Sequence, residues 1–67
     1  MKKGMEMAEV MELIARMGWE LVEDEQYEED GTVYHTLTVW QGDHGCAVAF
    51  GADGKVADLE YIPEWAI

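Results

Sequence analysis

The sequence predicts an α+β fold in which one N-terminal helix packs on one face of a four-stranded antiparallel meander sheet. The hydrophobic period changes from three or four residues to two after Gly18, which separates a helix from strands. Three glycine-containing turn signals then divide the remainder into four strands. A chain of 67 residues has room for one small core, so we expect residues 1–67 to form a single acidic α+β domain.

The expected helix extends from Met5 to Met17. Its charged residues lie largely off a stripe of apolar residues that recur at three- and four-residue spacing. The members of the stripe are Met7, Val10, Met11, Ile14 and Met17. Gly18 suits the left-handed residue that closes a helix, so the helix should end near Met17.

The four expected strands are Trp19–Glu28, Thr32–Gln41, Cys46–Gly51 and Val56–Ile62. Asp53-Gly54 is a strong signal for a two-residue turn in the last hairpin. The pairs that follow from this turn are Phe50 with Ala57, Val48 with Leu59 and Cys46 with Tyr61. These side chains share one face, which we expect to be the core face.

The middle hairpin extends the same apolar face. A two-residue turn at Asp43-His44 pairs Val39 with Val48 and Leu37 with Phe50. Both registers place Val48 at the centre of the sheet. A slip by one residue would send every one of these side chains to the opposite face, so the agreement between the two hairpins supports the expected sheet.

The first hairpin has two possible registers. A type I turn with a bulged glycine at Glu29-Asp30-Gly31 places Leu21 opposite Val39 and Tyr27 opposite Val33. A plain Asp30-Gly31 turn places Val22 opposite Val39 instead. Both registers remain open. In either one the first strand lies at an edge of the sheet, where its carboxylates deter edge-to-edge aggregation.

One helix covers only one face of a sheet, so we expect the other face to be exposed. The residues of this uncovered face are Tyr34, Thr36, Thr38, Trp40, Ala47, Ala49, Asp58 and Glu60. The tail after Pro63 is either a strap that packs Trp65 on the core or covers Trp40, or a loose end, and both alternatives remain open.

Charge is the strongest functional signal in the chain. The net charge is −11, and no lysine or arginine lies between Arg16 and Lys55. Seven acids fall within the eleven residues from Glu20 to Asp30. Such uncompensated charge destabilises the compact state, which indicates a basic partner. Alternate residues on a strand lie about 6.6–6.8 Å apart, so this run can present carboxylates at a pitch comparable with successive phosphates of one DNA strand.

Enzymatic chemistry is not expected. The only nucleophile would be Cys46 with His35 or His44 as its base, but Cys46 lies on the predicted core face. A chain of this size also has no second layer to enclose an active-site cleft. We therefore expect no enzyme and no cofactor.

Metal, nucleic-acid and membrane sites are not expected either. The alternating acids from Asp24 to Asp30 fail the EF-hand pattern, and His44 with Cys46 lacks a second ligand pair for zinc. The charge has the wrong sign for direct binding of nucleic acid. Glutamates interrupt any apolar run near the N-terminus, and a lone cysteine suits a reducing compartment, so we expect a cytoplasmic protein without a membrane span.

This compact, strongly acidic α+β chain, with the Glu20–Asp30 run on an edge strand, resembles the small phage-encoded anti-CRISPR proteins and related DNA-mimic inhibitors. The resemblance lies in size, charge and architecture and includes no sequence motif, so no site residue is transferred by position. It implies a stoichiometric inhibitor that blocks the DNA-recognition surface of a CRISPR effector complex, such as a Cascade-type subunit, in the cytoplasm of a bacterial host.

We therefore expect an acidic inhibitor that binds a basic nucleic-acid-binding protein. Its partner-binding residues are expected to be Glu20, Glu23, Asp24, Glu25, Glu28, Glu29, Asp30, Tyr34 and Trp40. The aromatic members would supply the desolvated anchors of the contact. Two alternatives remain: an immunity-like or accessory subunit that binds a basic protein, and a divalent-cation-binding module that uses the same carboxylates.

Overall fold

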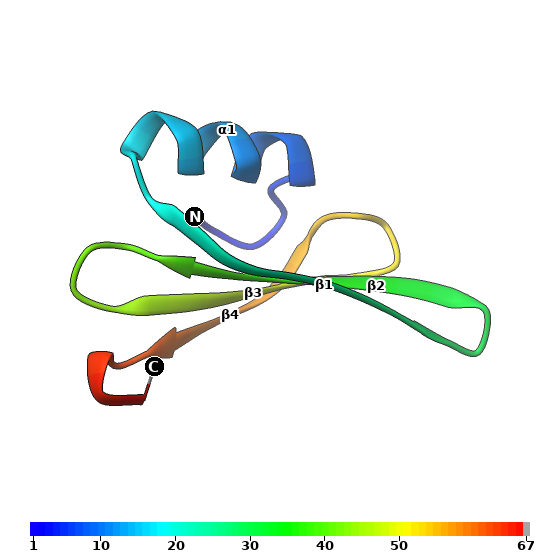
Figure 1. The fold of residues 1–67 in the computed structure, drawn as a ribbon. Helices are drawn as coiled ribbons and strands as arrows, with labels where there is room; N and C mark the ends of the chain where they lie inside the picture. Colours follow the sequence, from blue (N-terminus) through cyan, green and yellow to red (C-terminus); the bar gives the residue numbers. More distant parts are fainter. Residues whose placement is uncertain (67) are drawn as a thin grey trace.

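The computed structural model describes residues 1–66 and has the expected α+β architecture. Its elements are α1 (Met7–Met17), β1 (Glu20–Glu29), β2 (Thr32–Trp40), β3 (Gly45–Phe50), β4 (Val56–Ile62) and the short 3₁₀ helix η1 (Glu64–Ala66). The strands form one antiparallel sheet in the order β1-β2-β3-β4. Helix α1 lies over one face of this sheet (Figure 1). The prediction of one helix on a four-stranded meander is therefore confirmed.

Helix α1 begins after Glu6, whose backbone N–H donates to the Glu9 carboxylate at 3.1 Å. It ends as expected at Gly18, which adopts a left-handed conformation with φ 71°. The buried face is narrower than the predicted stripe. Met11 is 40% exposed and Met17 is 55% exposed, because an 11-residue helix on a small sheet buries little more than the one line of side chains that points at the strands.

The core lies between α1 and the sheet. Its buried residues are Val10, Ile14, Leu37, Val39, Val48, Phe50 and Val56. The N-terminal segment closes one end of this layer, since the Gly4 N–H donates to the Val56 carbonyl at 2.9 Å and the Val56 N–H donates to the Met5 carbonyl at 2.8 Å. One face of the sheet is therefore covered by α1 through apolar contacts, and the other face has no covering layer among the described residues.

The β1–β2 hairpin contains parts of both predicted registers. Near the turn the plain register holds, because Asp30 and Gly31 both have positive φ, 52° and 78°, as a two-residue type I′ turn requires. A bulge between Leu21 and Glu23 then restores the pairing of Leu21 with Val39. The predicted pairs of Tyr27 with Val33 and of Val22 with Val39 are wrong.

The β2–β3 hairpin corrects the second predicted register. Val48 pairs with Leu37 and not with Val39, and Val39 pairs with Cys46. The loop has four residues, 41–44, and is closed by the Gln41 N–H, which donates to the His44 carbonyl at 2.8 Å. The shift is two residues, so each side chain stays on its expected face.

The β3–β4 hairpin confirms the pairs of Val48 with Leu59 and of Cys46 with Tyr61. The predicted pair of Phe50 with Ala57 is wrong, because a bulge passes over Ala57 and sets Phe50 opposite Val56. Val56, whose side chain is larger than that of Ala57, is thereby buried in the core. Ala57 is exposed.

Of the two alternatives left open for the tail, the strap over the core is not formed. Trp65 lies in η1 and is 87% exposed, so it covers neither the core nor Trp40. The last residue of the predicted tail, at position 67, lies outside the described residues.

Val48 is fully buried at the centre of the sheet, and Val48→Asp should therefore unfold the chain. An unpaired buried charge costs about 3–5 kcal/mol, while a domain of this size has roughly 3–10 kcal/mol of stability in total. Val33 offers a matched control, because it lies in the neighbouring strand and is 53% exposed. Circular dichroism should show an unfolded Val48→Asp chain and a folded Val33→Asp chain. A cooperatively folded Val48→Asp chain would contradict the core described above.

Candidate partner-binding surface

The face of the sheet opposite α1, called the open face below, has a regular chemical pattern. The strand registers place its residues in rows that cross all four strands. The two central rows are Glu23, Thr38, Ala47, Glu60 and Glu25, Thr36, Ala49, Asp58. Each row has a carboxylate at both ends and small, partly exposed side chains between them. The open face is therefore a floor of threonine and alanine with an acidic column on each side.

These columns lie on the two edge strands. The β1 column is Glu23 and Glu25, and the β4 column is Asp58 and Glu60. Within a column the two residues are one strand repeat apart, about 6.6–6.8 Å. The two columns are separated by three strand spacings of about 4.8 Å, or about 14 Å in total.

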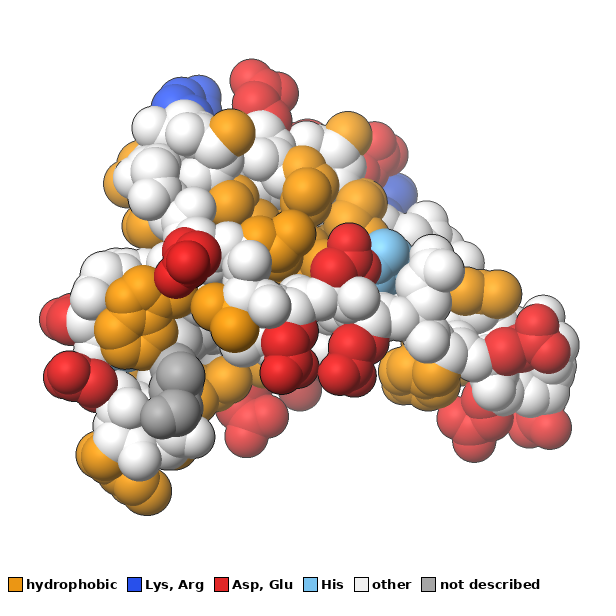
Figure 2. Space-filling view, in the orientation of Figure 1, with side chains coloured by type: hydrophobic (Ala, Val, Ile, Leu, Met, Phe, Trp, Pro, Cys, Tyr) orange, Lys and Arg blue, Asp and Glu red, His pale blue; other side chains and the backbone are white. Residues whose placement is uncertain are grey.

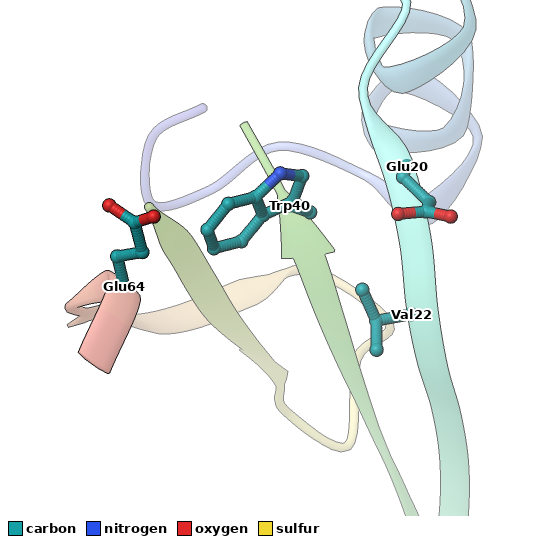
Figure 3. Close-up of a pocket in the computed structure, with 4 residues that line it drawn as sticks. All are labelled: Glu20, Val22, Trp40 and Glu64. Atoms are coloured by element: carbon teal, nitrogen blue, oxygen red, sulfur yellow. The ribbon is translucent and has the colours of Figure 1, made fainter. Parts of the chain in front are cut away.

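Aromatic side chains mark both ends of the floor. Tyr27 and Tyr34 stack with their ring centroids 5.4 Å apart. At the other end Trp40 lines a shallow, open pocket of about 400 Å³ together with Val22, Glu20 and Glu64 (Figure 3). The two glutamates lie on either side of the Trp40 ring, so this end is also acidic.

The structure divides the predicted partner-binding residues among three places. Five of them belong to the open face: Glu20, Glu23, Glu25, Tyr34 and Trp40. Asp24 and Glu28 alternate to the other side of β1, where Asp24 contacts the His35 ring nitrogen. Glu29 and Asp30 lie at the end of the hairpin. One continuous docking surface made of all nine residues is therefore not what the fold presents.

The second acidic column was missing from the predicted site. Asp58 and Glu60 had been placed on the uncovered face, but the rows that join them to Glu23 and Glu25 depend on the pairing of all three hairpins, and the middle one was predicted two residues out of register. Tyr27 likewise joins the site through its pairing with Tyr34. Glu64 had no signal in the sequence, because its place beside Trp40 depends on the 3₁₀ turn after Pro63.

The carboxylates are exposed and unneutralised. All fifteen aspartates and glutamates of the chain are exposed. Within residues 1–66 the only ion pairs of carboxylates are with His35 and His44, and none involves lysine or arginine. The four cations lie in the N-terminal segment, in α1 and in the β3–β4 turn: Lys2, Lys3, Arg16 and Lys55. In Figure 2 the blue side chains lie beside the helix, where red ones lie as well, and the side chains along the sheet include red ones without blue neighbours.

A second pocket contains the chemistry that a nucleophilic mechanism would use. It is open, measures about 300 Å³ and is lined in part by His44, Cys46 and Tyr61. The Nδ1 atom of His44 lies 2.5 Å from Oδ1 of Asp43, and this hydrogen bond lowers the pKa of the Asp43 carboxyl. Burial raises the pKa of the Cys46 thiol, which keeps it protonated and weakly nucleophilic at neutral pH.

The structure shows no dedicated metal site in the part of the chain that it describes. No three His, Cys, Asp or Glu side chains of residues 1–66 come close enough together to hold a metal ion. In the same residues, no helix combines the length and the apolar character needed to cross a membrane. Comparison with protein-family models, with curated proteins and with solved structures gives no match.

Because burial raises its pKa, Cys46 should react slowly with iodoacetamide in the folded chain at pH 8. The thiolate is favoured more strongly in the unfolded chain, so labelling in urea should be faster, and the difference should shrink as the pH rises above the folded pKa. The same shift means that native stability falls as the pH rises from the unfolded pKa to the folded one. Mass spectrometry of timed aliquots measures the rates. Equal rates in the folded and unfolded chains at pH 8 would contradict the protected thiol.

Proposed function

We propose that this chain is an acidic protein-binding inhibitor that occupies the surface with which a basic protein holds nucleic acid. One observation carries the proposal: exposed carboxylates, none of them paired with lysine or arginine in residues 1–66, line both sides of a sheet face that no helix covers. A folded chain gains nothing in stability from this arrangement, because like charges repel. The gain arises when a cationic surface neutralises them.

The geometry of the columns supports mimicry of a phosphate backbone. Glu23 and Glu25 repeat along β1, and Asp58 and Glu60 repeat along β4, at about 6.6–6.8 Å. The strands hold the backbone positions of these residues at this spacing. A groove of lysine and arginine that normally releases counterions when it binds DNA can do the same with such a surface. Charge of this kind also speeds diffusional encounter with a basic partner.

A DNA-binding CRISPR effector, such as a Cascade-type complex, is the partner class that the resemblance to anti-CRISPR proteins suggests. Charge complementarity between the open face and the DNA-recognition surface of such a complex is the physical support for this choice. The protein would then act in the cytoplasm of a bacterial host. An accessory or immunity-like subunit would bind a basic protein equally well but would leave DNA binding intact, and this difference separates the two functions.

The test is competition with DNA. The chain is immobilised, a basic protein is captured from bacteria that express CRISPR effector complexes, and the purified pair is titrated with duplex DNA. Inhibition predicts that DNA releases the captured protein, and that the apparent affinity of the protein for DNA falls in proportion to the concentration of the chain. The affinity of the chain for its partner should also weaken steeply with salt. A captured protein that binds DNA unchanged at saturating chain concentration would make the chain an accessory subunit and not an inhibitor.

A further inference from the structure

The open face has the width of one α-helix. Its two acidic columns are about 14 Å apart, and a helix with its side chains is about 10–12 Å in diameter. The floor between the columns consists of small side chains: Thr36, Thr38, Ala47 and Ala49. Small residues allow the backbone of a partner element to approach closely. A helix that rests on this floor therefore has a carboxylate column along each flank.

The length of the floor is also defined. From Tyr34 to Trp40 the chain advances six residues, or about 20 Å at about 3.3 Å per residue. A helix that rises 1.5 Å per residue covers this distance with about 13 residues. The stacked Tyr27–Tyr34 pair borders one end, and the acidic pocket at Trp40 borders the other. These groups offer apolar contact to the two ends of such a helix.

A helix fits the charge pattern better than an extended segment. A strand points alternate side chains in opposite directions, so it reaches both columns only when one of its backbone edges faces the floor. That edge would then set its N–H and C=O groups against threonine and alanine side chains, without the backbone partners of a sheet, whereas a helix pairs its backbone groups internally. A helix presents two flanks, and lysine and arginine extend sideways on long aliphatic stems. Strand addition at the edge of β1 is also disfavoured, because that edge carries the Glu20–Asp30 carboxylates.

We propose that the open face binds a single basic α-helix of the partner, which runs along the strands with lysine or arginine on both flanks and small or apolar residues toward the floor. This inference rests on the proposed function and names the part of the partner that is masked. The occupant is identified by complementarity of charge, width and length, and helices with basic flanks of this kind are common elements of nucleic-acid-binding surfaces.

The direct test uses a synthetic helical peptide of about 14 residues with lysines on two flanks and an alanine–leucine stripe between them. Its control is an isomer of the same composition with lysines distributed evenly around the helix. In a titration followed by ¹H–¹⁵N NMR, the two-flank peptide should bind about tenfold more tightly than the isomer, with saturable shifts at Thr36, Thr38, Ala47 and Ala49. Equal affinities, shifts confined to the outer edge of β1 or to the hairpin turn, or no saturation at millimolar peptide would each overturn the proposal.

Two charge-matched variants test the same surface within the protein. Glu23→Gln/Glu60→Gln removes one carboxylate from each column, whereas Glu12→Gln/Asp53→Asn removes two exposed carboxylates in α1 and in the β3–β4 turn, off the open face. Both variants change the net charge equally. The first should weaken peptide binding about tenfold and the second less than about twofold. Equal losses would mean that net charge alone drives binding, which would overturn the proposal.

Failure of this inference and failure of the proposed function give different results. If Glu23→Gln/Glu60→Gln blocks DNA binding by the captured protein as well as the unaltered chain does, the inhibitor function stands and the open face is not its docking site. If the unaltered chain does not compete with DNA, the inhibitor function fails. The peptide titration then still decides whether the open face accepts a basic helix.

Discussion

Repulsion between exposed carboxylates is the constraint on which the rest of this structure depends. Two unit charges about 6.7 Å apart repel by about 0.6 kcal/mol in bulk water. This distance is shorter than the Debye length of about 8 Å at physiological ionic strength, so neighbours within one column still interact there. The two columns, about 14 Å apart, are largely screened from each other. Cations that neutralise one column therefore do little for the other, and a partner that neutralises both must carry positive charge on two sides.

The fold withstands this repulsion because its attractive contacts are concentrated on the other face. Seven buried side chains lie between α1 and the sheet, and the four cations lie on or near that layer. Between its two acidic columns the open face has the small residues threonine and alanine. Each edge strand also has a bulge, at Val22 in β1 and at Ala57 in β4. Bulges increase local twist and disturb the hydrogen-bonding edge, which protects both edges from unwanted pairing.

Local signals made the elements of the fold predictable, and packing decided the registers. Asp53-Gly54 and the alternation around Val48 were sufficient for the central pairs of the last hairpin. The bulge at Ala57 was not predictable from turn chemistry. It buries Val56 in the core in place of Ala57, and the two additional carbon atoms of the valine side chain stabilise the fold by roughly 1.5 kcal/mol. This stabilisation offsets the cost of a hydrogen bond that a bulge removes from the ladder, about 0.5–1.5 kcal/mol. Only part of the candidate site could be predicted, again because local signals do not fix the strand registers. The β1 column followed from the acidic run, whereas joining it to the β4 column needed correct pairing across three hairpins.

The central claim is that the carboxylates of the open face are held together against their mutual repulsion. The free energy of unfolding, measured in urea at increasing NaCl concentration, tests it most directly in the unaltered chain and in Glu25→Gln/Asp58→Asn, which neutralises one residue of each column. The variant should be more stable at low salt and less sensitive to salt, and the two stabilities should converge as screening increases. A variant that is less stable than the unaltered chain at low salt, with an equal dependence on salt, would contradict the claim.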